Sequence, residues 1–267
     1  MVTTMLAARV SPGRVGAVLG RNVAALRTGP SYWLVLLSGF FEPVLYLLSI
    51  GVGVGALVGG LELPGGGVVD YAVFVAPAML AVSAMSGALS ETTFNFFFKM
   101  KYSKTFEAVL ATPVRPLEIA LGELSWALVR SSLYTGAFLV VMVALGLTSP
   151  VGALAAFPAA LLVGVAFGGV GMAISTLMRG WQDFDLLTTG QFALFLFSGT
   201  FSPVRDYPAV MEAVVAVTPL FHAVELVRGL AVGQPGWGLL GHAAYLVVMA
   251  VAGLVFAARR IQRTLCV

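Results

Sequence analysis

Charged residues are scarce in this chain. Only 10% of its 267 residues are Asp, Glu, Lys or Arg, while 59% are hydrophobic and the mean hydropathy is +0.98. A soluble domain usually carries about 25% charged residues. A water-soluble fold of this length cannot bury so much apolar surface, so most of the chain is predicted to lie in lipid.

Cysteine and histidine are rarer still. The single cysteine, Cys266, is the penultimate residue, which excludes an internal disulfide and a cysteine-based metal site. With two histidines and 12 acidic residues in the whole chain, neither a metal site nor a catalytic centre is expected. The net charge is +3, but the basic residues separate apolar runs and form no continuous surface, so nucleic acid is not an expected partner.

Six apolar stretches approach or exceed the ~20 residues that a helix needs to cross a bilayer. They cover residues 31–57, 71–97, 119–146, 151–177, 186–201 and 237–258. The fifth is short and runs into Gly199 and Pro203, so its helix is expected to break before a full crossing. The pattern predicts an all-α membrane protein with six transmembrane helices.

The basic residues predict the orientation of these spans. With the N-terminus inside, the outer side receives only Arg205 and Arg228. The cytoplasmic side receives Arg9, Arg14, Arg21, Arg27, Lys99, Lys101, Lys104, Arg115, Arg179, Arg259, Arg260 and Arg263. Lys and Arg accumulate in short cytoplasmic loops, so both termini are predicted to be cytoplasmic. The chain then divides into a tail with an interfacial helix (1–30), a six-span domain (31–258) and a C-terminal tail (259–267).

The N-terminal segment is amphipathic and lacks the compact apolar core of a cleavable signal peptide. Val15, Val18, Leu19, Asn22, Val23 and Leu26 recur at helical spacing on one side. Arg14 and Arg21 share another side, and Gly29-Pro30 ends the pattern. This predicts a helix lying in the cytoplasmic interface, either as an anchor or as a lever that moves the first span.

The segment between the second and third spans reads KMKYSKTFEAVLATPVRPLEI and holds every lysine of the chain. These are Lys99, Lys101 and Lys104. Ser103 or Thr105 is expected to cap a short cytoplasmic helix that ends before Pro113, and Pro116 is expected to begin the third span. From charge alone, the lysines either only set topology beside anionic lipid head groups or also mark a docking surface.

Residues 198–231 are interrupted by glycine and proline, which predicts two half-helices at 207–217 and 220–231 near the outer face. His222, Glu225 and Arg228 follow at intervals of three and are expected to share one helix face and bond to one another.

Two ionisable residues stand out inside the spans, where such groups are usually paired or functional. Glu42 and Arg130 each lie 11 residues into a span that starts inside, at a depth of ~16 Å. Equal depth suggests an ion pair. Alternatively, one or both face a hydrated cavity, or Glu42 is protonated.

Small and aromatic residues in the spans predict packing and a path. Gly164, Gly168, Gly169 and Gly171 favour close helix packing in the fourth span. A set of aromatic residues either lines a path for an amphipathic substrate or only packs: Phe40, Phe41, Tyr46, Phe94, Phe192, Phe195 and Phe197.

The order of these features, with SGTFSPVRDYP…TPLFHAVELVRGL and KTFEAVLATPVRPLEI, resembles the permeases of type-2 ABC exporters. That family includes nodulation-factor (lipooligosaccharide) and daunorubicin-resistance permeases. The resemblance covers nearly the whole chain. It implies that the helix after the second span, together with the N-terminal helix, docks on a separate ATPase subunit. The residues it assigns to coupling are Arg14, Arg21, Lys99, Lys101, Lys104, Thr105, Phe106 and Glu107.

The same resemblance implies that the broken helices line the outer end of the path, with Pro203, Pro219, His222, Glu225 and Arg228 as the motif. It also implies a second copy of the chain, or a related permease, around that path. The chain contains no G-x-x-x-x-G-K-[ST] motif. It is therefore expected to be no enzyme and to bind no cofactor, with ATP and Mg held by the partner ATPase.

The resulting expectation is a multi-pass subunit of the cytoplasmic membrane that exports a lipid-linked saccharide, a glycolipid or a hydrophobic drug. One rival is an intramembrane enzyme acting on lipids, but the spans are expected to offer no acid or base beyond Glu42 and Arg130. The other rival is an ATP-independent carrier or channel. Carriers often show paired broken helices in inverted repeats, whereas only the C-terminal half is broken here.

Overall fold

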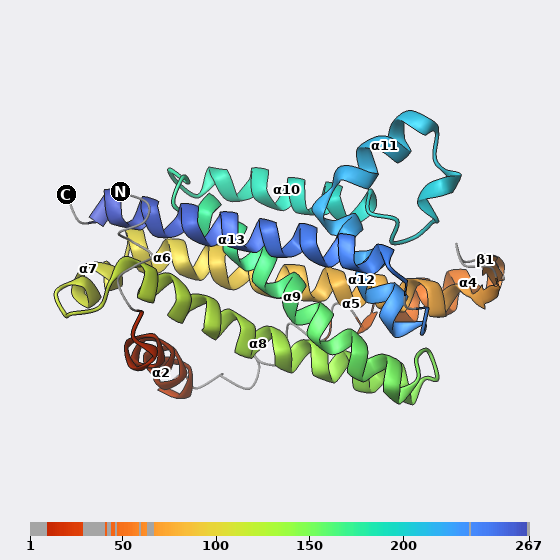
Figure 1. Cartoon of the computed structure of the whole chain (residues 1–267), viewed down its shortest axis with the longest axis horizontal. Coiled ribbons are helices and arrows are strands. Elements are labelled where there is room, and N and C mark those ends of the chain that lie inside the picture. The colour runs from red at the N-terminus through yellow and green to blue at the C-terminus, as the bar shows by residue number, and fades with distance from the viewer. Residues whose placement is uncertain are drawn as a thin grey trace.

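The computed structural model describes residues 10–28, 41, 44–45, 47–58, 60–62, 67–234 and 236–265. Within these ranges the chain forms an elongated bundle of helices (Figure 1). Four continuous helical stretches are long and apolar enough to cross a bilayer: Tyr71–Lys101, Pro116–Ala144, Pro150–Ser175 and Gly238–Thr264. They correspond to the predicted second, third, fourth and sixth spans.

The second of the predicted spans is built from three consecutive helical segments. Helix α5 (Tyr71–Ser90) passes into the π-helix η2 (Glu91–Asn95), which passes into α6 (Phe96–Lys101). In η2 the hydroxyls of Thr92 and Thr93 donate to the carbonyls of Ala88 and Leu89, at 2.7 and 2.6 Å. A π-helical turn inside an α-helix commonly occurs at a functional site, because it re-aims the side chains around it.

Proline and polar caps fix where the other long helices begin. Helix α8 (Pro116–Ala144) starts with proline, and the Glu118 carboxylate accepts the backbone N–H of Arg115 at 2.9 Å. Helix α9 (Pro150–Ser175) also starts with proline, and Ser149 Oγ accepts the N–H of Gly152 at 3.0 Å. Helix α13 (Gly238–Leu265) completes the set. The predicted start of the third span at Pro116 is confirmed.

The predicted first and fifth spans are not among these four helical stretches. Residues 31–40, 42–43 and 46 of the first span lie outside the described ranges; the described part of this stretch includes the π-helix η1 (Leu47–Val54) and α4 (Gly55–Val58). The fifth begins and ends earlier than predicted, as α10 (Gln182–Leu196), and its 15 residues reach only ~22 Å. The helices agree with an all-α membrane protein, and the six-span count stays a prediction.

A small β-hairpin departs from the all-α expectation. Strands β1 (Gly60–Glu62) and β2 (Val68–Asp70) pair antiparallel, with Leu61 opposite Val69, between the predicted first and second spans. The hairpin and α4 lie at the end of the bundle away from α2 (Pro12–Thr28) and α7 (Thr105–Leu110), as Figure 1 shows. We call the end that holds α2, α7 and the last turn of α13 the charged end.

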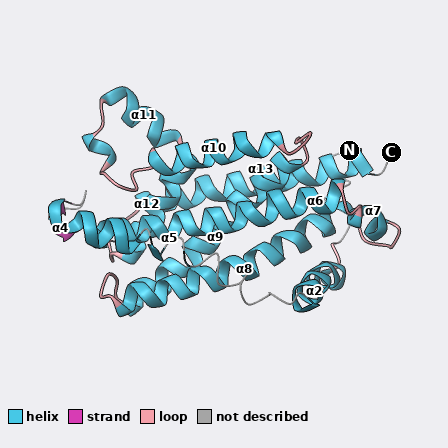
Figure 2. Ribbon diagram, turned by 180° about the vertical axis from the view of Figure 1, so that it is seen from behind, coloured by secondary structure: helices cyan, strands magenta, loops and turns pink. Residues whose placement is uncertain are grey.

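The broken C-terminal segment agrees closely with its prediction. After the short turn η3 (Val204–Asp206), helices α11 (Ala209–Val217) and α12 (Pro219–Ala231) meet at an angle of 83°. Pro219 at the first position of α12 explains the sharp break, because it cannot continue the preceding helix. Figure 2 shows α11 standing away from the bundle while α12 lies within it.

Glycines bring α9 and α13 into backbone contact, as expected for the fourth span. A Cβ atom added at Gly169 would lie 2.9 Å from the Ala250 carbonyl oxygen, and one at Gly253 would lie 2.6 Å from the Gly169 carbonyl carbon. The side chains of Leu124 and Thr92 likewise leave no room for a Cβ atom at Gly168 and Gly171, respectively. Small residues allow this approach, and the attraction between the helices comes from close packing.

We therefore expect Gly253→Ala to destabilise the detergent-purified protein, because the methyl group meets backbone atoms that cannot rotate away. Overpacking of this kind costs about 1–3 kcal/mol. The measurement is thermal unfolding followed by tryptophan fluorescence. Gly241→Ala on the same helix is the control, since its Cβ meets nothing within 4 Å. Equal melting temperatures for the two variants would contradict the close α9–α13 contact.

Candidate functional site

The lysine segment folds as predicted into a short helix, α7, but its cap differs from the prediction. Lys104 stands at the N-cap with φ 50° and ψ 27°, and neither Ser103 nor Thr105 caps the helix with its side chain. These two hydroxyls bond to each other, with 2.7 Å between Ser103 Oγ and Thr105 Oγ1. Phe106 is buried and packs on Phe96, with 4.8 Å between the ring centroids, so α7 is anchored to the bundle.

The three lysines occupy two different environments. Lys101 is exposed, and the Lys104 side chain is 69% exposed, with its Nζ 3.9 Å from a carboxylate oxygen of Glu107. The Lys99 side chain is only 21% exposed and points into the bundle. Lys101, Lys104 and Glu107 therefore remain at the surface, whereas Lys99 is committed to internal contacts.

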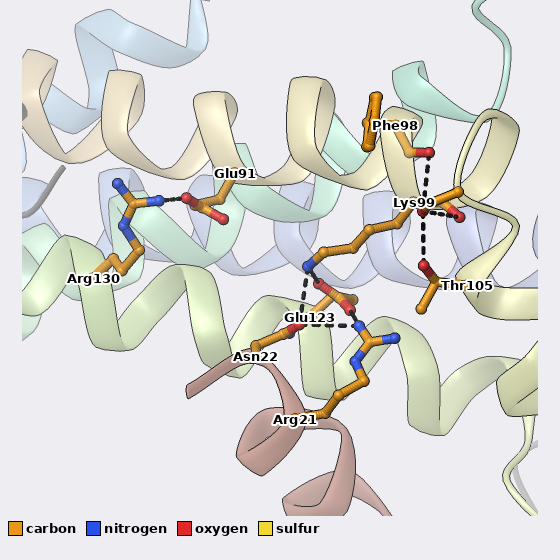
Figure 3. A network of polar contacts seen from close by, with 9 residues as sticks. Arg21, Asn22, Glu91, Phe98, Lys99, Thr105, Glu123 and Arg130 are labelled. Atoms are coloured by element: carbon orange, nitrogen blue, oxygen red, sulfur yellow. Dashed lines mark hydrogen bonds and ion pairs between the residues drawn. The ribbon is translucent and has the colours of Figure 1, made fainter. Parts of the chain in front are cut away.

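Lys99 belongs to a network centred on Glu123 of α8, shown in Figure 3. The two Glu123 carboxylate oxygens accept from Lys99 Nζ at 2.6 Å and from Arg21 Nη2 at 2.7 Å. Asn22 Oδ1 accepts from the same two groups, at 3.0 Å from Lys99 and 2.9 Å from Arg21. We call these four residues the Glu123 clamp, because it joins α2, α6 and α8.

A second carboxylate of α8 holds the start of α2. Glu118 is fully buried, and its Oε1 accepts the backbone N–H of Ser11 at 2.9 Å. Arg14 Nη1 lies 3.6 Å from Glu118 Oε2. Between the two carboxylates, Val18 of α2 packs directly over Gly122, where an added Cβ would lie 2.5 Å from the Val18 Cβ. The predicted amphipathic helix is therefore docked on α8 by charge at both ends and by close packing in the middle.

Inside the bundle, Arg130 forms an ion pair with Glu91 of the π-helical segment (Figure 3). The Arg130 guanidinium also donates to the Tyr134 hydroxyl, with Nη2 at 2.8 Å and Nε at 3.3 Å. Glu42, the partner suggested by its depth, lies outside the described residues. Arg130 therefore has a carboxylate partner that the sequence does not single out.

A cavity of about 730 Å³ surrounds this ion pair. Its walls come from α5, η2, α8 and α10, and include Glu91, Arg130 and Tyr134. Of the aromatic residues considered for a path, Phe94, Phe192 and Phe195 line the cavity. Phe41 and Phe197 are exposed, at 54% and 45%, while Phe40 and Tyr46 lie outside the described residues.

The charged and histidine residues of the outer half-helix motif make two separate sets of contacts. Glu225 and Arg228 pair with each other, and His222 contacts a different helix. Arg228 is buried and donates to Glu225 at 2.7 Å, to the Gly199 carbonyl at 2.7 Å and to the Phe74 carbonyl at 3.2 Å. Its guanidinium carbon lies 3.8 Å from the centroid of the Phe74 ring, a cation–π geometry. The expected Glu225–Arg228 bond is confirmed. Pro203 precedes η3 and Pro219 begins α12, so both prolines mark the breaks.

His222 does not join that pair but meets the other histidine of the chain, on α13. The Nδ1 atoms of His222 and His242 lie 2.7 Å apart, and the His222 ring stacks on Tyr245 with 4.0 Å between centroids. The Tyr245 hydroxyl donates to the Val217 carbonyl at 3.0 Å, across the α11–α12 break. Among the described residues, no group of three or more His, Cys, Asp or Glu side chains is placed to hold a metal ion.

Three buried carboxylates therefore correct the expectation that the spans hold no acid beyond Glu42. Glu91, Glu118 and Glu123 are 6%, 0% and 4% exposed. The signal that singled out Glu42, an acidic residue within an apolar run, applies equally to Glu91 and Glu123. The sequence does not reveal which residues pair with these carboxylates, because the partners are distant in the chain. Arg21 and Glu123, for example, are 102 residues apart.

Long apolar helices with paired interior charges and an exposed basic turn at one end are features of a polytopic membrane protein. The chain matches the family model described as "ABC-2 type transporter" over residues 15–232, and it belongs to this family. It is thus an ABC transporter permease and a transmembrane protein.

Curated relatives of the chain agree with this family. It is 33% identical to nodulation protein J of Rhizobium leguminosarum bv. trifolii over 263 residues, which are 92% of this chain and 98% of the relative. It is 32% identical to nodulation protein J of Sinorhizobium fredii over 231 residues, 86% of each chain. Nodulation protein J of Rhizobium leguminosarum bv. viciae is 31% identical over 231 residues, 86% of this chain and 87% of the relative.

The Glu123 clamp predicts that Glu123→Gln loosens α2 from α8. The change removes the charge shared by Lys99 and Arg21, and a hydrogen bond to a charged group contributes about 1.5–3 kcal/mol. With Val18→Cys as a reporter in a Cys266→Ser background, maleimide labelling should accelerate about tenfold or more, because a loss of about 1.4 kcal/mol already shifts an opening equilibrium tenfold.

The matched control is Glu107→Gln in the same reporter background. Glu107 also faces a lysine, but its side chain is 50% exposed and surface pairs contribute about 0–1 kcal/mol. Its labelling rate should equal that of the reporter chain alone. If Glu123→Gln behaves like Glu107→Gln, the clamp does not hold α2.

Proposed function

We propose that this chain is the transmembrane subunit of an ATP-driven exporter that moves an amphipathic molecule out across the cytoplasmic membrane. The observation that carries the proposal is membership of the ABC-2 family over residues 15–232, which include α2, α7, the cavity and the broken helices. The substrate classes that fit are a lipid-linked saccharide, a glycolipid and a hydrophobic drug. The relatives named nodulation protein J support a permease of this kind.

ATP hydrolysis in this proposal belongs to a separate ABC ATPase subunit, which holds ATP and Mg. The chain itself contains no phosphate-binding G-x-x-x-x-G-K-[ST] motif. The docking surface is the exposed part of the lysine segment, Lys101, Lys104 and Glu107. Buried Phe106 and the α7 backbone carry a push on that surface into the bundle.

The Glu123 clamp gives this push a route to more than one helix. Lys99 follows the cavity-lining segment η2 along the chain, and its ammonium group is bonded to α8 and α2 at once. Arg14 and Arg21 contribute by keeping α2 on α8, through Glu118 and Glu123. A displacement of α6 must move α2 with it or break charge-assisted hydrogen bonds.

The proposed arrangement places the charged end in the cytoplasm, with a tail and interfacial helix at 1–30, a permease domain at 31–258 and a tail at 259–267. Membrane lipids surround the permease domain. A second copy, or a related permease, completes the path, because one chain of this family supplies half of the transmembrane assembly.

Orientation can be tested with two single-cysteine variants in a Cys266→Ser background. Glu107→Cys lies at the charged end and Arg205→Cys lies on η3, and both side chains are exposed, at 50% and 46%. A membrane-impermeant maleimide applied to intact cells should label Arg205→Cys alone, and both after permeabilisation. Labelling of Glu107→Cys in intact cells would contradict the cytoplasmic placement of the charged end.

The partnership can be tested by a gentle-detergent pull-down from native membranes. The double variant Lys101→Glu with Lys104→Glu should lose an ATPase that co-purifies with the natural chain, because both ammonium groups are exposed and the reversed charges repel an acidic docking site. The loss should be about tenfold or more, since like charges placed opposite one another cost several kcal/mol.

Arg205→Glu is the control, because it reverses an exposed charge on η3, outside the proposed docking surface, and should retain the ATPase. Lys99 is left unchanged in this experiment, since reversing it would break the Glu123 clamp and confuse docking with folding. If the double variant keeps the ATPase, coupling lies elsewhere. If no ATPase co-purifies with the natural chain, an ATP-independent carrier becomes the better description.

A further inference from the structure

The chain has two histidines, and the fold brings them into contact near the break in the C-terminal segment. His222 lies in the first turn of α12, and His242 lies near the start of α13. Their Nδ1 atoms are 2.7 Å apart although the residues are 20 positions apart in the sequence. Figure 1 shows α12 toward the end of the bundle opposite the charged end. Both side chains are partly exposed, so the contact is not sealed within the core.

A hydrogen bond between two Nδ1 atoms needs one proton between them. One ring must donate its Nδ1–H, and the other must accept through a bare Nδ1. The bond therefore forms when both imidazoles are neutral, and also when one of them is an imidazolium ion. When both rings are protonated, both Nδ1 atoms carry hydrogen and no acceptor remains. Two positive charges then face one another, and the contact must open.

Aromatic rings fix the orientation of the pair. The His222 ring stacks on Tyr245, with 4.0 Å between centroids. The Phe221 ring contacts both imidazoles edge-on, with centroids 5.6 Å from His222 and 5.8 Å from His242. A first positive charge on the stacked imidazole is favoured by cation–π attraction to the Tyr245 ring. The pair can therefore carry one charge without separating.

Glu225 is the carboxylate that acts on the pair from its own helix. It interacts electrostatically with His242, and it accepts from Arg228 at 2.7 Å. It favours a first positive charge on the histidines, while Arg228 balances the negative charge of the carboxylate. Apart from His242 and Tyr245, the ionisable side chains of α13 are the arginines of its last turns, at the charged end.

The elements packed on α12 and α13 add few ionisable groups near the pair. Helix α9 contains none, α5 contains only Tyr71, and α11 contains only Glu212, which is exposed. In η3, Arg205 Nε lies 3.9 Å from Asp206 Oδ1. Helix α8 meets α13 at the charged end. The two histidines are therefore the groups near the break whose ordinary titration falls close to neutral pH.

The second half of α12 is held by contacts that do not involve histidine. Arg228 donates to the Phe74 carbonyl of α5 at 3.2 Å and lies over the Phe74 ring. Gly229 packs under Leu239, where an added Cβ would lie 2.7 Å from the Leu239 Cδ2. The start of α12 depends on the histidine pair and on the bond from the Tyr245 hydroxyl to the carbonyl at the end of α11. Loss of the pair therefore loosens the break and leaves the rest of the helix in place.

We propose that His222 and His242 form a proton-operated latch, which holds the start of α12 on α13 while at least one ring is neutral and releases it when both are protonated. The open form binds one more proton than the closed form. Falling pH therefore shifts the equilibrium toward the open form by up to about tenfold per pH unit.

The pH range of the latch follows from histidine chemistry. Unperturbed histidine protonates near pH ~6.5, and clustered histidines act as switches at about pH 5–6, so release is expected in that range. The latch itself does not require ATP or a substrate. Only its assignment to the external pH rests on the proposed function, because that assignment uses the cytoplasmic placement of the charged end.

The test measures the distance between α11 and α13 with two spin labels on the full chain in lipid nanodiscs. The labels are attached to Val214→Cys and Val248→Cys in a Cys266→Ser background, and both valines are exposed, at 63% and 68%. One distance is expected at about pH 7.5, and a second, longer one should appear at about pH 5, with a population ratio that changes up to about tenfold per pH unit. A distribution that does not change between these pH values would overturn the proposal.

His242→Asn in the labelled chain removes the titration and keeps the hydrogen bond. The asparagine Oδ1 takes the place of the histidine Nδ1 and accepts from His222 whether that ring is neutral or charged. The short distance should therefore persist at about pH 5. His222→Asn should behave in the same way, because release needs two titrating rings. Appearance of the longer distance in either variant at about pH 5 would assign the response to other groups and overturn the latch.

Tyr245→Phe supplies a variant that keeps both histidines. It retains the ring that stacks on His222 and removes the bond to the Val217 carbonyl. The closed form is then weaker while the proton linkage is unchanged, so the midpoint of opening should move to higher pH, by up to about one unit for a tenfold weaker closed form. A midpoint that does not move would show that the opening is not at this break, and would overturn the proposal.

The outcomes separate this inference from the proposed function. If the ATPase co-purifies with the chain but the label distance does not respond to pH, the latch is wrong and the exporter assignment stands. If the distance responds as expected but no ATPase co-purifies, the latch stands and the ATP-driven assignment is wrong.

Discussion

The Glu123 carboxylate is the contact on which the charged end of the molecule depends. A lone carboxylate buried in an apolar helix bundle is strongly destabilising unless it is paired and hydrogen-bonded. Glu123 is satisfied by Lys99 from the end of one membrane helix and by Arg21 from the N-terminal helix. Three segments that are distant in sequence therefore have one low-energy arrangement, and α2 becomes part of the bundle.

Charge pairs recur at three levels along the bundle, each with a different surrounding. The Glu123 clamp lies at the charged end, Glu91 and Arg130 lie inside the bundle, and Glu225 and Arg228 lie on the helix after the break. Arg228 also donates to two backbone carbonyls and lies over an aromatic ring, and these contacts hold the broken segment against α5. The middle pair, Glu91 and Arg130, lines the cavity of about 730 Å³.

Hydropathy and the positions of proline and glycine predicted the parts of this fold that depend on local sequence. Proline and glycine placed the start of α8 and the break before α12, and apolar run length placed four spans. The pairings were not predictable, since they join residues such as Arg130 and Glu91 or His222 and His242 through packing of separate helices. The role of Lys99 was missed for the same reason: a cluster of lysines looks uniform in sequence, and only burial distinguishes one of its members.

The backbone at Lys104 has a consequence for how the basic turn meets another surface. A residue with a side chain pays roughly 1–2 kcal/mol to adopt the left-handed conformation, so glycine would relieve this position. With lysine there, the backbone that carries this charged side chain is already held in the turn at the head of α7. A partner that binds this turn does not have to order its backbone. The entropic cost of docking is therefore smaller than for a flexible loop.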